Sequence, residues 1–327
     1  MRLLIEEKSS LKWLEYIVLF SLMVLIVALS FMFFPASVYL ALLIPLPVLI
    51  ATYRHSVLLG AVIAALSSVF FVFLLMNAGV VILIVALSTV GIGIGAAMRE
   101  KLDYKKILAV GIISALLTVM LVGIGLYLTM GQTPKEIFNE TADRILTELS
   151  TRDIPVQTEQ VEALIETVRI LYPSMIAVGA VALALVNFLA GSWALVRLKM
   201  TDVPALPPLT RWAFPMWLSV AFIVVWVLTW QIFAFLPQPI LFVVANLANF
   251  LHWLMTIQGL CIVLSFLRTI RLPIWGIVLL VLPVWLFAPW FMALLGTLDP
   301  WLHFRGRIRL SQEERMRQLE KNKRDQN

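Results

Sequence analysis

Polar side chains recur on one face of the apolar segment Ile240–Leu267. At about 100° of rotation per helical residue they fall within about a third of the circumference. They are Asn246, Asn249, His252, Trp253 and Thr256. In hydrocarbon, such groups need polar partners in a helix bundle or a cavity. The spacing therefore predicts either a ligand-facing stripe or a set of hydrogen bonds between helices, and both interpretations stay open.

A basic pair, Arg54 and His55, directly follows the apolar segment Ala36–Thr52. That segment is short and contains Pro45 and Pro47, which predict a kink or a local break in the helix. Broken helices occur at membrane depth where protein or a cavity satisfies the freed backbone groups. We therefore predict that Arg54 and His55 share an internal ligand-binding site with Asn246, Asn249 and His252. A tolerated proline kink is the alternative.

Two tryptophans, Trp226 and Trp230, are four residues apart inside another apolar segment. This spacing places both rings on one helix face, where they could form an aromatic wall for a planar ligand. The alternative is that they belong to the aromatic belt that membrane proteins place at the lipid–water interface.

Catalytic and metal-binding motifs are missing from the sequence. It contains one cysteine, Cys261, and three widely separated histidines, with no phosphate-binding loop and no paired metal ligands. We expect no enzyme activity, no metal site and no cofactor. The middle of each apolar segment also lacks Asp, Glu, Lys and Arg, which ion-coupled transporters usually retain. An autonomous pump is therefore disfavoured, and the net charge of +6 is attributed to cytoplasmic loops rather than to nucleic-acid binding.

The surrounding elements are apolar helices. Of the 327 residues 61% are hydrophobic and only 13% are charged, about half the charged share of a soluble domain. Because a spanning helix needs about 20 apolar residues, we predict an all-α polytopic transmembrane bundle in a bacterial inner membrane. Nine apolar segments are expected: Leu14–Phe34, Ala36–Thr52, Ser56–Met76, Gly79–Ala97, Ile107–Met130, Leu171–Val196, Phe214–Phe235, Ile240–Leu267 and Pro273–Leu295.

Loop charges predict the orientation of these segments. The basic loops 99–106 and 197–211 should be cytoplasmic, whereas residues 131–170, with four basic and eight acidic residues, should lie outside. Within that outer stretch we predict a helical hairpin that begins with a capping box from Thr133 to Glu136. The tail 301–327 is strongly basic and therefore cytoplasmic. Nine crossings would put it outside, so we expect eight crossings and one re-entrant or tilted segment at Pro273–Leu295.

Small residues recur at four-residue spacing in several segments. They include Gly60 with Ala64, Gly91 with Gly95, Gly111 with Ala115, and Ala180 with Ala184. Such stripes allow helix backbones to approach closely. We expect packing within the chain, with docking to a partner membrane subunit as the alternative.

Three stretches, in order, resemble the YybS-like family of bacterial multi-span membrane proteins. They are Leu46–Val48 running to Tyr53–His55, Gln258–Leu260, and Gly296–Trp301 leading to Phe304-Arg305, with His303 departing from the acidic residue expected there. The first six spans of this family resemble the substrate-binding S-component of energy-coupling-factor transporters. The resemblance implies a small organic substrate and separate coupling and ATPase subunits as partners.

Together these patterns divide the chain into a six-span, S-component-like bundle (1–200), additional spans (201–300) and a basic cytoplasmic tail (301–327). We expect a substrate-binding subunit for uptake of a small organic molecule. The alternative is a membrane scaffold or regulatory protein that acts through helix contacts and its tail. In either case we expect the protein to contact the lipid bilayer as its main partner.

Overall fold

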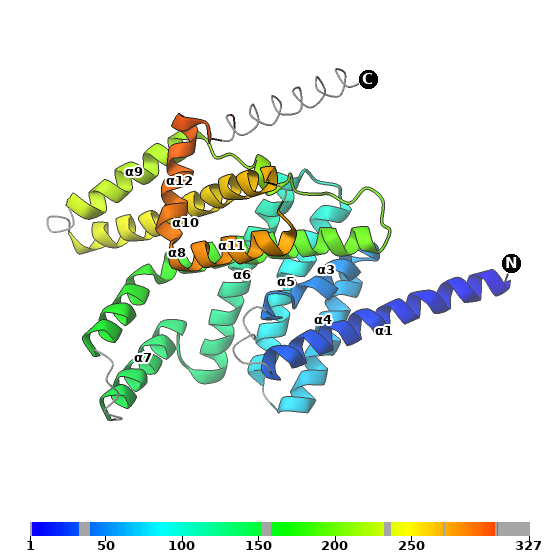
Figure 1. Cartoon of the computed structure of the whole chain (residues 1–327). Helices are drawn as coiled ribbons and strands as arrows, with labels where there is room; N and C mark the ends of the chain where they lie inside the picture. Colours follow the sequence, from blue (N-terminus) through cyan, green and yellow to red (C-terminus); the bar gives the residue numbers. More distant parts are fainter. Residues whose placement is uncertain are drawn as a thin grey trace, which may run out of the picture. The chain divides into compact units, whose positions relative to one another are not determined.

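The computed structural model describes residues 2–32, 40–76, 78–151, 158–231, 237–270, 272–304 and 306, and within them it is helical without strands (Figure 1). The predicted all-α fold is confirmed. Contacts between residues divide the chain into two compact units, Met1–Ile165 with Ile176–Leu206, and Glu166–Met175 with Pro207–Asn327. The basic tail from residue 307 onward lies outside the described residues.

Within the described residues, six of the nine expected segments are helices long and apolar enough to cross a membrane. They are α1 (Arg2–Met32), α4 (Val57–Leu75), α5 (Ala78–Arg99), α6 (Tyr104–Met130), α8 (Thr158–Arg197) and α10 (Gln238–Thr269). Their exposed surfaces are rich in large apolar side chains, as a lipid-facing surface requires.

The other three expected segments differ from straight spans. α3 (Pro45–Arg54) has ten residues, and α9 (Met216–Gln231) has 16 within the described part. The last segment forms α11 (Ile274–Phe287) and α12 (Pro289–Leu302), bent by 100° at a break around Ala288. This break agrees with the expected re-entrant or tilted segment, whereas the number of crossings stays a prediction.

α3 is the central helix of the first unit. The chain turns at residues 42–44, and Pro45 and Pro47 then lie in the first turn of α3, where missing backbone N–H groups cost little. The prolines therefore begin a helix rather than kink one. α3 is almost entirely buried from Val48 to Thr52.

Glycines allow this burial. A side chain on Gly91 of α5 would overlap the Pro45 carbonyl, and one on Gly95 would come within 2.7 Å of the Leu49 carbonyl. A side chain on Gly60 of α4 would overlap the Thr52 hydroxyl. The predicted small residues of α4 and α5 thus pack against α3, and Gly111 of α6 packs against Ile94 and Ala184. This is the expected packing within the chain, and docking to a partner subunit stays a prediction.

The polar outer stretch begins as predicted. The carboxylate of Glu136 accepts hydrogen bonds from the Thr133 N–H (2.6 Å) and hydroxyl (2.9 Å), and the Glu136 N–H donates back to the hydroxyl (3.3 Å). This capping box opens α7 (Pro134–Thr151). The two bonds that the Glu136 carboxylate accepts from Thr133 lower the pKa of Glu136 below its ordinary value. The second part of the predicted hairpin belongs to α8, which begins at Thr158 and continues without a break into the sixth apolar segment.

In the second unit, α10 and α12 cross at two glycines. A side chain at Gly259 of α10 would overlap the Met292 carbonyl, and one at Gly296 of α12 would overlap the Met255 carbonyl. The backbones are therefore in direct contact at this crossing. The last expected apolar segment ends at Leu295, before Asp299. In the structure Asp299 lies inside α12 and is only 7% exposed.

Candidate functional site

A charged cluster forms where α1 meets the end of α3 in the first unit. The Nε of Arg54 lies 2.9 Å from Glu15 Oε1, and His55 Nε2 lies 3.2 Å from the same oxygen. The three side chains are 16–26% exposed, so the group is largely shielded from solvent. The ion pair between Arg54 and Glu15 uses Nε and leaves the terminal guanidinium nitrogens available for a further acceptor.

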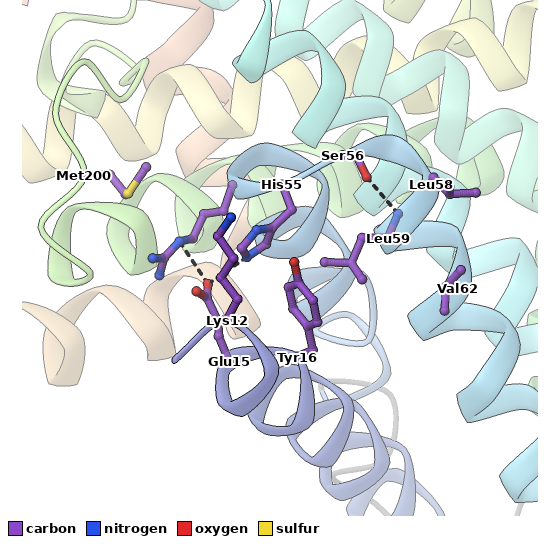
Figure 2. A pocket seen from close by; sticks show the side chains of 10 residues that line it. Lys12, Glu15, Tyr16, His55, Ser56, Leu58, Leu59, Val62 and Met200 are labelled. Carbon is purple, nitrogen blue, oxygen red and sulfur yellow. Dashed lines mark hydrogen bonds and ion pairs between the residues drawn. The ribbon is translucent and has the colours of Figure 1, made fainter. Parts of the chain in front are cut away.

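These residues line an open pocket of about 860 Å³. Figure 2 shows Lys12, Glu15 and Tyr16 pointing from α1 toward His55. The Tyr16 ring meets His55 edge-on, with centroids 4.9 Å apart. The volume falls in the range of small-molecule sites. The two cationic side chains of Lys12 and Arg54 face a single carboxylate, that of Glu15, so the pocket favours an anion.

The N-terminus of α4 forms another wall of the pocket. Ser56 caps this helix by accepting a hydrogen bond from the Leu59 N–H (3.1 Å). Leu58 and Val62 of the same helix also line the pocket and are 74% and 41% exposed. The pocket wall is therefore continuous with an apolar outer surface, and the positive end of the helix dipole adds to the field there.

In the second unit, Asn246 bonds to the turn of α8 that contains Pro173. Its Oδ1 accepts from the Ser174 N–H (2.9 Å), and its Nδ2 donates to the Ile170 carbonyl (2.9 Å). In an uninterrupted helix these two backbone groups pair with each other. Asn246 thus bridges backbone groups next to a proline, where the helix ladder is weakened. Asn249 donates to the Ser174 hydroxyl (2.9 Å) in the same cluster.

His252 has different surroundings. Its ring lies 4.3 Å from that of Trp290 and 6.1 Å from that of Phe222, measured between centroids. Trp226 contacts Trp290 at 6.2 Å. The buried Nδ1 of His252 has no hydrogen-bond partner among the described residues. His252 and Trp226 therefore share an aromatic cluster, and His252 keeps a polar atom that a ligand could bind.

The structure thus divides the predicted site residues between the two units. Arg54 and His55 lie in the first unit with Glu15, and Asn246, Asn249, His252 and Trp226 lie in the second. The side chain of Trp230 lies outside the described part of the chain. One site shared by all of them stays a prediction.

Sequence reasoning missed several partners of these residues. Glu15 and Lys12 were not singled out, although a lone carboxylate at the start of an apolar segment signals a nearby cation. Ser174 and Trp290 carried no comparable signal. Among the described residues no group of three His, Cys, Asp or Glu side chains could hold a metal ion.

Comparison with known families adds one match. The family described as "Predicted membrane protein (DUF2232)" matches residues 21–300. The chain belongs to this family. The match spans both units, so the DUF2232 region includes α3 with Arg54 and His55, and the α10–α12 crossing. Three residues of the charged pocket, Lys12, Glu15 and Tyr16, precede the matched region. Comparisons with curated proteins and with solved structures found no match.

Proposed function

We propose that this DUF2232 protein is a substrate-binding membrane subunit that takes part in the uptake of a small organic molecule. The observation that carries the proposal is the pocket in the first unit. It combines Lys12, Arg54 and His55 with one carboxylate and has room for a small organic anion. A binding role needs no catalytic set, and we propose that the protein is not an enzyme.

The position of the pocket in the chain supports a role at the inner side of the membrane. Met200 lines the pocket, and it lies in the basic loop 197–211 that the charge rule assigns to the cytoplasm. Lys101 of the other basic loop pairs with Asp202 of this one at 3.3 Å. We propose that the pocket holds the substrate at the cytoplasmic end, the side from which an uptake system releases it.

The sequence resemblance supports the rest of the proposal. An S-component-like subunit depends on coupling and ATPase subunits for energy, and we propose these as partners in a bacterial inner membrane. The runner-up function is a membrane scaffold. The small-residue faces that could support it are already used inside the first unit, which favours the binding role.

Binding can be tested with the purified protein in a neutral detergent. Small carboxylates and phosphate esters are added in turn, and the midpoint of thermal unfolding is measured. We expect at least one anion to raise the midpoint in the parent and not in Arg54→Gln, while Arg99→Gln, which removes an exposed charge outside the pocket, behaves like the parent. A parent protein that no anion stabilises would contradict the binding role.

The uptake role needs a separate test. A pull-down in mild detergent from the native membrane should recover an ATPase and a coupling-type membrane protein. Recovery of soluble regulatory proteins without any ATPase would favour the scaffold function instead.

A further inference from the structure

We infer that the pocket around Arg54 binds the phosphate headgroup of a membrane amphiphile, with the hydrocarbon chain of that molecule lying along α4. The inference rests on one part of the proposed function, the binding of an organic anion in this pocket, and it names the class of that anion. It commits to a lipid-borne phosphate rather than a soluble one.

The donors that face the pocket are of the type that binds phosphate. The Nε of Arg54 is held by Glu15 at 2.9 Å, which orients the guanidinium and directs its terminal nitrogens elsewhere. A guanidinium fork matches two phosphate oxygens, and a lysine such as Lys12 adds a point charge. Lys12 lines the pocket and makes no ion pair within the part of the chain that the structure describes. The site therefore supplies what a phosphate group needs.

Aromatic residues beside the pocket indicate its depth in the bilayer. Trp13 follows Lys12 directly, is 67% exposed and meets Tyr16 edge-on with centroids 5.7 Å apart. Exposed tryptophan beside tyrosine and lysine is typical of the level of the lipid headgroups. From Ile17 onward the exposed residues of α1 are apolar except for Ser21, as in a helix that enters hydrocarbon. The charged pocket thus lies at headgroup depth.

An exposed apolar surface of α4 continues outward from the pocket. Leu58 and Val62 line it, and further exposed apolar side chains continue on the same face of α4. At 100° per residue this stripe stays within about 80° of the helix circumference. Its members are Leu58 (74% exposed), Val62 (41%), Leu66 (54%), Val69 (53%) and Phe73 (79%). A soluble phosphate ester would gain nothing from this stripe, whereas an acyl or polyprenyl chain would cover it.

Loop charges indicate the side of the membrane on which the pocket lies. The pocket is lined by a residue of a loop that the charge rule assigns to the cytoplasm. The cytoplasmic leaflet carries anionic lipids, and basic pockets between helices on that side bind phosphate headgroups. Charge, depth and apolar continuation thus point to the same class of ligand.

The test measures thermal stabilisation of the full chain in neutral detergent during titration with three probes. They are phosphatidylglycerol, phosphatidylcholine and free glycerol 3-phosphate. We expect phosphatidylglycerol to raise the unfolding midpoint at the lowest concentration and phosphatidylcholine to have little effect. Glycerol 3-phosphate should need a concentration higher by about tenfold or more, because it cannot cover the α4 stripe.

Matched variants assign the effect to the pocket. Arg54→Gln and Lys12→Gln should each raise the required phosphatidylglycerol concentration by about fivefold, the expected contribution of one basic residue near an anionic lipid. Arg99→Gln, at an exposed position outside the pocket, should change it by less than about twofold. The double variant Leu58→Ala with Val62→Ala should weaken the binding of phosphatidylglycerol but not that of glycerol 3-phosphate. Its control is Leu116→Ala on the exposed side of α6. Lys12→Gln keeps the test valid if Arg54→Gln fails to fold.

Each remaining result has a definite meaning. Equal potency of glycerol 3-phosphate and phosphatidylglycerol would overturn the lipid inference and leave the proposed anion pocket intact. Equal loss of binding in Arg54→Gln and Arg99→Gln would overturn the specific site, because it would indicate attraction to general surface charge. Failure of all soluble and lipid anions to stabilise the parent would reject the proposed pocket itself.

Discussion

Asn246 illustrates how a single polar residue is accommodated in an apolar helix. Its carboxamide bonds to the Ser174 N–H and the Ile170 carbonyl, both 2.9 Å away, and so provides an acceptor and a donor next to Pro173. Asn249 makes one bond to the hydroxyl of Ser174. Two of the polar side chains predicted to share one face of this helix, Asn246 and Asn249, therefore make hydrogen bonds between helices. His252 differs from them, because its buried Nδ1 has no hydrogen-bond partner among the described residues.

The first prediction concerns this difference in partners. Asn246→Ala removes two bonds between helices and should lower the free energy of unfolding by about 1.2 kcal/mol, at about 0.6 kcal/mol for each bond. Asn249→Ala removes one and should cost about 0.6 kcal/mol. SDS unfolding in mixed micelles measures both values. Equal costs, or a larger cost for Asn249→Ala, would contradict the bridging role of Asn246, and neither variant should change anion binding at Arg54.

At the scale of the helices, close backbone approach holds each unit together. The α10–α12 crossing depends on Gly259 and Gly296, and the burial of α3 depends on Gly91 and Gly95. Membrane helices gain little from hydrophobic burial against each other, so packing distance determines the strength of their association. By contrast, Gly179 of α8 has no neighbouring atom within 4 Å of the position of an added side chain.

The second prediction tests this crossing. Gly259→Ala and Gly296→Ala should each destabilise the protein by about 1–3 kcal/mol, because the clash is with backbone carbonyls that cannot rotate away. Gly179→Ala, the control, should be neutral or stabilising by up to about 1 kcal/mol through helix propensity. Unfolding in SDS again provides the measurement. Unchanged stability in both crossing variants would show that the helices do not approach as closely as described.

The third prediction concerns the capping box at α7. Because bonds from Thr133 lower the pKa of Glu136, their stabilising effect is present above the ordinary glutamate pKa and is lost as pH falls through the lowered value. Carboxyl NMR of labelled glutamates in detergent should show a signal that titrates below the ordinary glutamate pKa, and this signal should vanish in Glu136→Gln. In Thr133→Val, which retains the N–H bond but not the hydroxyl, the pKa should rise part of the way to normal.

At the scale of the whole molecule, the charge distribution determines the orientation in the bilayer. Basic residues concentrate in loops 99–106 and 197–211 and in the tail, and acidic residues concentrate in 131–170. The ion pair between Lys101 and Asp202 joins two of the loops assigned to the cytoplasm within the first unit. This agrees with the expectation that both loops lie on one side.

The fourth prediction tests the orientation by cysteine labelling. Glu148→Cys, Lys101→Cys and Lys323→Cys are exposed separately to an impermeant thiol reagent in intact cells. Only Glu148→Cys should react, and the native Cys261 is buried and provides a low background. Permeabilised cells are the positive control for the other two sites. Reaction at Lys323→Cys without reaction at Glu148→Cys would reverse the assignment.

The fifth prediction is that the chain does not drive transport alone. Ionisable residues are sparse in its spans, and the buried carboxylate of Asp299 lies in the bent helix α12. Reconstituted protein should therefore accumulate no ligand under a proton or sodium gradient. Gradient-driven accumulation would contradict the need for partner subunits, and its loss in Asp299→Asn would identify the coupling residue.

Local and compositional signals in the sequence determined the membrane class and much of the helix layout. A run of about 20 apolar residues predicts a helix without knowledge of its neighbours, because a segment inside hydrocarbon must pair its own backbone groups. Short-range patterns were equally decisive, because the capping box from Thr133 to Glu136 involves only neighbours in the chain. The membership of residues 21–300 in a membrane protein family agrees with this class.

Tertiary structure alone decided which polar residues meet. Glu15 and Arg54 are 39 positions apart, and Asn246 and Ser174 are 72 apart, so no periodicity in the sequence could pair them. The same holds for the glycines, whose spacing allows close approach but does not name the helix that approaches. Pro45 and Pro47 predicted an interruption, yet only packing against α5 made the helix after it the centre of the first unit. Such pairings depend on how helices assemble, because a side chain in hydrocarbon takes whichever partner the fold brings within reach.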